Sequence, residues 1–110
     1  EGAALRAYEK VLGIPPVSAE LANNTAWLLL TAKDSDLRDS GRALDLAGFA
    51  AWHSEQGYIL DTLATALWAV GRKEEALELE KKAAALDPKN RAYYQAQKEK
   101  FQEETWQGNK

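Results

Sequence analysis

The chain contains no cysteine, no methionine and a single histidine among its 110 residues. Without cysteine it cannot form disulfides or thiolate metal sites, and one histidine cannot supply the set of ligands that a zinc site needs. The sequence also lacks an acidic calcium loop and a glycine-rich phosphate loop. We therefore expect no metal and no cofactor. A chain without cysteine fits a reducing or an oxidising compartment equally well.

Long apolar runs and an excess of basic residues are also missing. No apolar run is longer than that from Ala26 to Leu30, whereas a membrane-spanning helix needs roughly 20 such residues. Lys and Arg number 14 against 17 Asp and Glu, which argues against nucleic acid or an anionic membrane surface as the main partner. No signal-peptide pattern opens the chain. We expect a soluble protein without a membrane span, in the cytoplasm or the periplasm.

The residues that are abundant favour helix. Ala, Leu, Glu and Lys dominate, β-branched residues are scarce, and no alternating strand pattern occurs. The fold class is predicted to be all-α. Apolar residues recur at helical spacing in six segments, bounded by turn residues and possible caps such as Ser18, Asp39 and Gly71. The predicted helices cover about 4–12, 18–32, 40 to 52–55, 57–70, 73–86 and 91–106.

The segment from Gly57 to Asn90 has a recognisable order of residues. Small and apolar positions Leu63, Ala64 and Leu67 precede a turn at Gly71, and Ala76 and Ala83 precede a stop at Asp87-Pro88. This order resembles the tetratricopeptide repeat, a pair of helices about 34 residues long. Small side chains at such positions let two helices pack closely.

Two earlier segments continue the resemblance less regularly. Ala43 and Ala50 keep the seven-residue spacing of Ala76 and Ala83, so 18–56 is interpreted as a variant repeat with a long turn at 33–39. This variant, with Arg38-Asp39 before its second helix, is similar to one in bacterial tetratricopeptide proteins. Residues 1–16 resemble the second helix of a truncated repeat, and 91–106 a capping helix. Because the chain also starts at Glu1, we interpret it as a fragment of a longer protein.

The resemblance implies a single tetratricopeptide-like domain over 1–110. Its expected architecture is an α-solenoid of antiparallel helix pairs in a right-handed superhelix with a carboxy-terminal capping helix. In this family, partners bind in the concave groove lined by the first helix of each pair. Carried onto this sequence, Glu20, Thr31 and Ala69 would face that groove. The residues expected to bind a peptide or partner protein there are Asn23, Asn24, Trp27, Leu30, Tyr58, Asp61, Thr62, Thr65 and Trp68.

Each of these side chains also has a structural interpretation. Trp27 and Trp68 lie among apolar neighbours and would suit the core as well as the groove. Asn23 and Asn24 could form hydrogen bonds between helices, and Asp61 could favour the amino-terminal end of its helix dipole. The carboxylate clamp of chaperone-binding members needs basic and amide groups. This chain has other residues at most of those positions, such as Thr62 and Ala96.

The predicted function is that of a protein–protein interaction scaffold without catalytic activity. The single histidine, His53, lies in a predicted loop with no serine, cysteine or carboxylate placed to make it a base. The alternative is a structural or self-association module, because an unpaired amino-terminal face could bind a second copy and form a homo-oligomer. The sequence does not identify the partner.

Overall fold

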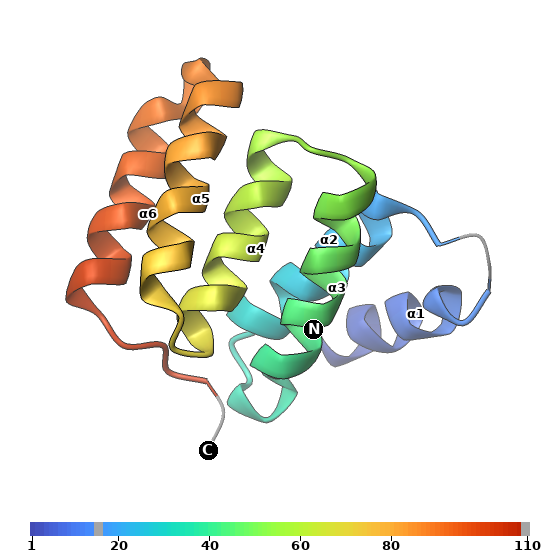
Figure 1. Ribbon diagram of the computed structural model, residues 1–110. Helices are drawn as coiled ribbons and strands as arrows, with labels where there is room; N and C mark the ends of the chain where they lie inside the picture. The colour runs from blue at the N-terminus through green and yellow to red at the C-terminus, as the bar shows by residue number, and fades with distance from the viewer. Residues whose placement is uncertain (15–16, 109–110) are drawn as a thin grey trace.

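The computed structural model describes residues 1–14 and 17–108. Helices and connecting segments make up all of this part of the chain, and it contains no β-strand, so the predicted all-α class is confirmed (Figure 1). None of the described helices is long and apolar enough to cross a membrane. The helical elements are α1 (Gly2–Leu12), α2 (Ala19–Thr31), the 3₁₀ turn η1 (Ser35–Leu37), α3 (Ser40–His53), α4 (Gly57–Ala69), α5 (Lys73–Leu86), the 3₁₀ turn η2 (Pro88–Asn90) and α6 (Arg91–Glu103).

The helix boundaries follow from local chemistry that the sequence displays. The Ser18 hydroxyl accepts a hydrogen bond from the Leu21 amide at 3.0 Å and caps α2, and Asp39 caps α3 by accepting from the Arg42 amide at 3.1 Å. Gly71 follows α4 with φ of +89°, a left-handed conformation that glycine adopts without steric cost. Pro15 and Pro16, which follow the first helix in the sequence and favour its end, lie outside the described residues.

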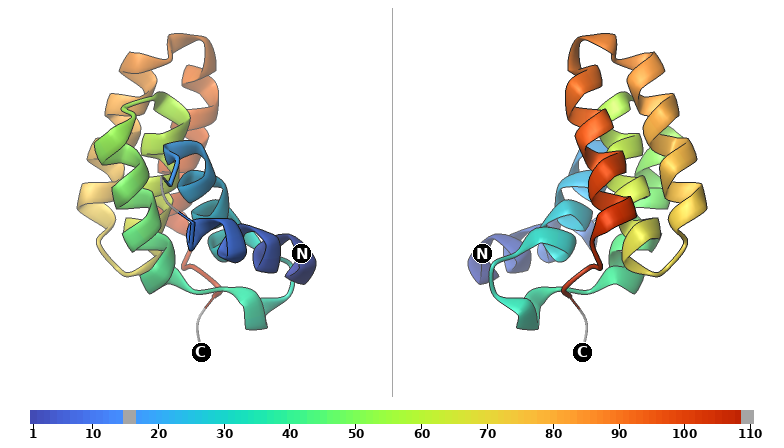
Figure 2. Two further views of the ribbon diagram at one scale, coloured as in Figure 1. Left: turned by 90° about the vertical axis from the view of Figure 1, so that its right-hand side faces the viewer. Right: turned by 90° about the vertical axis from the view of Figure 1, so that its left-hand side faces the viewer.

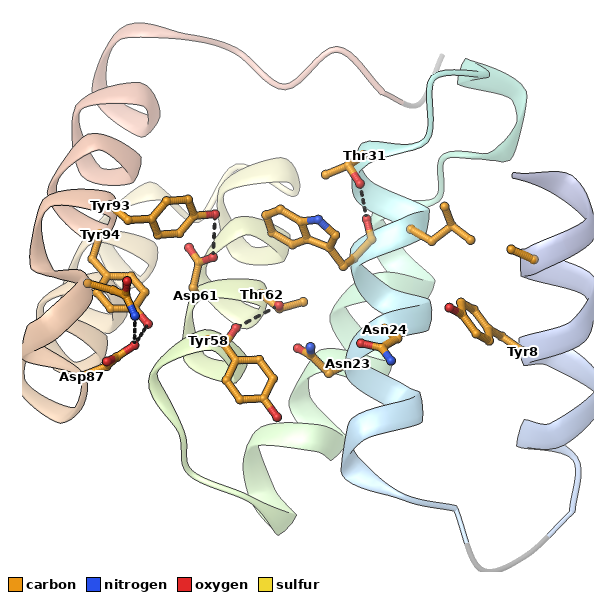
Figure 3. A pocket seen from close by; sticks show the side chains of 14 residues that line it. Tyr8, Asn23, Asn24, Thr31, Tyr58, Asp61, Thr62, Asp87, Tyr93 and Tyr94 are labelled. Atoms are coloured by element: carbon orange, nitrogen blue, oxygen red, sulfur yellow. Dashed lines mark hydrogen bonds between the residues drawn. The ribbon is translucent and has the colours of Figure 1, made fainter.

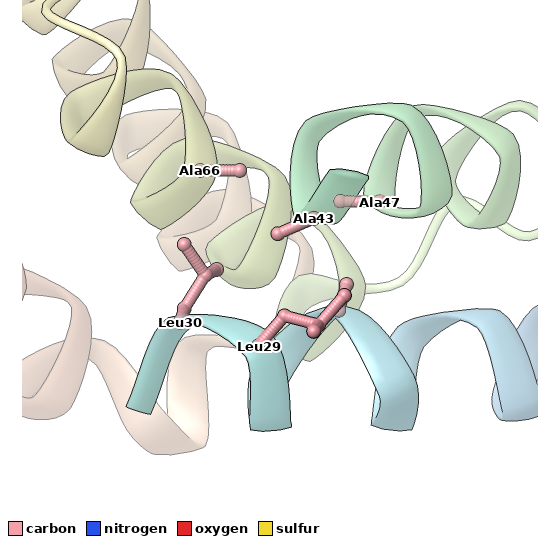
Figure 4. Close-up of a cluster of buried hydrophobic side chains, with 6 residues drawn as sticks. Leu29, Leu30, Ala43, Ala47 and Ala66 are labelled. Atoms are coloured by element: carbon pink, nitrogen blue, oxygen red, sulfur yellow. The ribbon is translucent and has the colours of Figure 1, made fainter. Parts of the chain in front are cut away.

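The helices pack mainly against their neighbours in sequence. Helices α2 and α3 form one hairpin and α4 and α5 another, with α3 against α4 and α6 against α5. Figures 1 and 2 show α1 at one end of this row and α6 at the other. The buried contacts are rich in alanine, and Ala26, Ala43, Ala47 and Ala66 are fully buried around Leu29 and Leu30 (Figure 4). These small side chains allow the close approach of helices that the sequence suggested.

The last helix is shorter than predicted. It ends at Glu103 rather than near Trp106, and Glu104 is already extended at φ −119° and ψ 161°. The Trp68 indole donates a hydrogen bond to the Glu104 carbonyl at 3.2 Å, which gives that oxygen a partner outside a helix. Beyond it, the chain turns back beneath the helices (Figure 2), and the Trp106 indole donates to the Leu30 carbonyl at 3.1 Å. The helical pattern of the sequence continues to Trp106, so it did not indicate that this residue would leave the helix and contact α2.

The long turn before α3 is organised in part by its own polar residues. The Asp34 carboxylate accepts a hydrogen bond from the Asp36 amide at 3.0 Å. The Arg38 guanidinium donates to the Ala32 carbonyl at 2.6 Å and also to the Gln107 carbonyl. Arg38 therefore joins this turn to the carboxy-terminal segment.

Candidate functional site

A hollow of about 720 Å³ opens between α1, α2, α4 and the segment that joins α5 to α6. We call it the central hollow. Its volume lies within the range that ligand-binding clefts usually have. Figure 3 shows side chains from these elements turned toward the same space. The aromatic residues that line it are Tyr8, Trp27, Tyr58, Tyr93 and Tyr94, and its polar lining includes Asn23, Asn24, Asp61, Thr62, Asp87 and Asn90.

Six of the nine residues predicted to bind a partner line the central hollow. Two helices bring them together: α2 supplies three, and α4 supplies the other three. Thr31, at the end of α2, lines it too. The helical phase places each set of three on one face of its helix, since residues three and four apart share a face, and the packing of α2 against α4 brings the two faces together. The six are Asn23, Asn24, Trp27, Tyr58, Asp61 and Thr62.

The other three predicted residues do not line the central hollow. Leu30 is 3% exposed and belongs to the core between α2, α3 and α4. Trp68 is buried against α6, where its ring stacks on Phe101 with centroids 5.1 Å apart. The Thr65 hydroxyl is turned back to the main chain of its own helix and donates to the Asp61 carbonyl at 2.8 Å. For Trp68 the core interpretation is correct, whereas Trp27 lines the hollow.

Two further parts of the chain supply lining residues that were not predicted from the sequence. Tyr8 comes from α1, and Asp87, Asn90, Tyr93 and Tyr94 come from the end of α5 and the start of α6. The last helix was interpreted as a cap, although it follows α5 in the position that the first helix of another pair would take. Its adjacent tyrosines, which have edge-to-face rings 5.6 Å apart, were the available signal.

Asp61 is the most constrained polar group of the hollow. It is 4% exposed, and its carboxylate accepts hydrogen bonds from the Gln97 amide at 3.0 Å and the Tyr93 hydroxyl at 3.2 Å. Both donors belong to α6. Asp61 therefore joins α4 to the last helix, and it lies beyond the first turn of α4, where the helix dipole would favour an acid most.

A second carboxyl group lies behind Asp61. Glu80 of α5 is 0% exposed, and its carboxyl group interacts with that of Asp61 and has no other hydrogen-bond partner among the described residues. Burial, reinforced by the nearby Asp61 carboxylate, raises the pKa of Glu80 to about 11, although Lys98 opposes the shift. Burial and the same carboxylate also raise the pKa of Tyr93. At neutral pH Glu80 is uncharged, so it adds no negative charge to that of Asp61.

The side-chain oxygen of Asn23 is buried without a hydrogen-bond partner among the described residues. The residue is 5% exposed, its amide oxygen makes no hydrogen bond among the described residues, and it lines the central hollow. In Figure 3 the Asn23 side chain extends from α2 toward Tyr58 of α4. A buried amide of this kind costs about 1–3 kcal/mol relative to a satisfied one. Asn23 is thus a polar group in need of a partner that the described residues do not supply.

The polar groups at the edges of the hollow are paired with one another. The Tyr58 hydroxyl donates to the Glu20 carboxylate at 2.8 Å, and this bond is the main reason why the pKa of Tyr58 is raised. Asp87 accepts from the Tyr94 hydroxyl at 2.6 Å and from the Asn90 amide at 2.9 Å. These two bonds lower the pKa of Asp87. Both edges of the hollow therefore carry acidic side chains.

The described residues that line the hollow include no lysine, arginine or histidine. In the described part of the chain, no group of three or more His, Cys, Asp and Glu side chains could hold a metal ion. The site thus combines aromatic rings, amides and carboxylates. Scans against protein-family models, curated proteins and solved structures found no match to this chain.

Proposed function

We propose that the chain is a protein-interaction scaffold that holds an extended peptide of a partner protein in the central hollow. We further propose that its hairpins are tetratricopeptide-type pairs stacked in a right-handed solenoid. The order of the helices supports this proposal, since α2 and α4, the first helices of the two hairpins, line the hollow together with the start of α6. A groove lined by first helices is what the resemblance implies.

The unpartnered amide of Asn23 is the observation that carries the proposal. An extended peptide presents N–H and C=O groups along its length, and an asparagine side chain can accept from one and donate to the other. A peptide in the hollow would therefore supply the missing partner and recover the cost of burying the amide. The aromatic rings around it would contribute contact area, as they do in many peptide-binding sites.

An array of short synthetic peptides of varied sequence tests the proposal, with hits measured by fluorescence polarisation. For peptides that bind, we expect Trp27→Ala to weaken binding by at least about tenfold, because aromatic side chains often dominate peptide affinity. The matched control is Trp52→Ala. Trp52 is 86% exposed on α3 and does not line the hollow, so its removal should leave affinity unchanged.

Asn23→Ala separates a binding role from a structural one. Because the amide oxygen has no partner among the described residues, removal of the side chain should weaken peptide binding without lowering the melting temperature. Loss of stability with unchanged affinity would show a structural role and contradict the proposal. If no peptide bound and light scattering showed a concentration-dependent dimer, self-association would be the better explanation.

A further inference from the structure

We propose that the central hollow recognises a basic side chain, arginine in preference to lysine, which it holds between Asp61 and Asn23. This inference rests on the proposed function and names the chemistry of the bound segment. It follows from three properties of the hollow in the described part of the chain: a carboxylate without a counter-ion, an amide oxygen without a partner, and a lining of aromatic rings.

The first property is that Asp61 has no counter-ion among the described residues. Its carboxylate accepts hydrogen bonds from the side chains of Tyr93 and Gln97, and the neighbouring Glu80 is protonated, so all of these neighbours are neutral. The ion pairs among the described residues lie elsewhere, and all are at least partly exposed. A buried carboxylate loses hydration that neutral donors only partly replace, so a cation entering the hollow would gain a strong, poorly screened interaction.

The second property is independent of the acidic groups. Asn23 is on α2, across the hollow from the α4 helix that carries Asp61, and its amide oxygen is an unused acceptor. A ligand that brings several N–H donors would satisfy it. The arginine guanidinium has five N–H donors in a plane, so it can donate hydrogen bonds to acceptors on two helices at once. The lysine ammonium is a compact point charge with three donors.

The third property is the aromatic lining. Trp27, Tyr58 and Tyr93 come from three different helices and all border the hollow. Positive charge over an aromatic face is attracted by the ring quadrupole, and a planar guanidinium also stacks on such faces. Asp87, and Glu20 through its bond to Tyr58, add negative potential at the edges. No lining residue among those described would repel a cation.

The test uses the full chain labelled with ¹⁵N and three small probes, titrated by NMR. The probes are the N-acetyl N-methylamides of arginine, lysine and citrulline, and citrulline has nearly the shape of arginine without its charge. We expect the arginine probe to bind at least about tenfold more tightly than citrulline and more tightly than lysine, and to shift the Trp27 indole N–H signal. Equal binding of arginine and citrulline would overturn the proposal without any variant.

Two variants locate the interaction. Asp61→Asn should abolish the preference for arginine over citrulline, whereas Asp45→Asn, which removes an exposed acid of α3, should preserve it. If the preference survived in Asp61→Asn, the arginine site would lie elsewhere and the proposal would fail. Should that variant not fold, the comparison of the three probes on the unaltered chain still decides the question.

The peptide array distinguishes failure of this inference from failure of the proposed function. Peptides that bind equally well after replacement of arginine by citrulline would support the scaffold and refute the arginine site. An arginine probe that binds at the hollow while no peptide does would support the site and refute the scaffold. If neither bound, both proposals would be wrong.

Discussion

Helices α4 to α6 bury large side chains against one another, whereas α1 contains no buried residue at all. Trp68 and Phe101 meet between α4 and α6, while α1 contributes only the partly buried Leu5 to the core. Yet α1 has the regular spacing of apolar residues that a packed helix has. An amphipathic pattern thus indicates which face a helix would bury, while the number of neighbouring helices decides how much of it is covered.

Polar contacts hold α1 against the rest of the fold, because its apolar contacts are few. The Glu9 carboxylate pairs with the Arg42 guanidinium of α3 at 2.6 Å, and the Glu1 carboxylate accepts from the Lys33 amide at 2.6 Å and the Asp34 amide at 3.1 Å. Those two backbone bonds lower the pKa of Glu1. Exposed contacts of this kind stabilise a fold only weakly. We therefore expect the two regions to differ sharply in their response to mutation.

The largest effect should come from truncating a buried ring in the α4–α6 region. Phe101→Ala should lower the free energy of unfolding by about 3–5 kcal/mol, because Phe101 is 1% exposed and its removal leaves a cavity beside Trp68. Val11→Ala in α1 should cost less than about 0.5 kcal/mol, because Val11 is 51% exposed. Urea denaturation measures both. Equal losses would show that α1 is as firmly packed as α6.

Within the well-packed region of α4 to α6, Glu80 is a buried acid whose ionisation should destabilise the fold. An acid whose pKa rises from 4.5 to about 11 on folding binds its proton more tightly in the folded state than in the unfolded one. Stability from this group is complete below about pH 4.5 and falls as pH rises. The fall is up to about 1.4 kcal/mol per pH unit until pH approaches the folded pKa. Thermal melts between pH 5 and 8 should show it.

Glu80→Gln should remove most of that pH dependence, since glutamine does not titrate. The variant should therefore be the more stable protein at pH 8, and the difference should shrink toward pH 5. The matched control is Glu78→Gln, which changes an exposed carboxylate of the same helix that pairs with Lys81. That variant should keep the slope of the unaltered chain. If the stability of Glu80→Gln and that of the unaltered chain changed equally with pH, Glu80 would not be the source of the pH dependence.

The sequence predicted the local features of this molecule well. Caps at Ser18 and Asp39 and the stop at Gly71 depend on neighbouring residues in the chain, and each was visible as a residue type at a defined position. Six side chains of α2 and α4 that share the central hollow were also predicted, because the resemblance to the tetratricopeptide repeat implies that the first helix of each pair lines a groove. Whether they bind a partner stays a prediction.

Features that depend on distant segments could not be found in this way. Trp68 turns to the core because α6 covers it, and Trp106 leaves the helical pattern because the Leu30 carbonyl is within reach of its indole. Tyr8 enters the hollow only because α1 packs beside α2. The buried pair of Asp61 and Glu80 was equally hidden, since residues on two helices show no joint pattern along the chain.

The space around two glycines, Gly57 and Gly48, also differs between the regions. At Gly57, the first residue of α4, an added Cβ would lie 2.7 Å from the Asp87 Cβ, 2.7 Å from the Tyr94 hydroxyl and 3.1 Å from the Ala83 carbonyl. At Gly48 in α3 it would meet no atom within 4 Å. Helices α4, α5 and α6 thus meet at a point where only glycine fits.

Gly57→Ala should therefore destabilise the protein by about 1–3 kcal/mol through overpacking. Gly48→Ala should stabilise it by up to about 1 kcal/mol, because alanine loses less backbone entropy than glycine when a helix forms. Both are measured by urea denaturation. Because Gly57 lies beside Asp87 and Tyr94, its variant should also weaken peptide binding in the central hollow, whereas Gly48→Ala should leave it unchanged. A neutral Gly57→Ala would mean that α5 and α6 can move away from α4 at little cost, and the contrast between the two regions would then be smaller than the packing indicates.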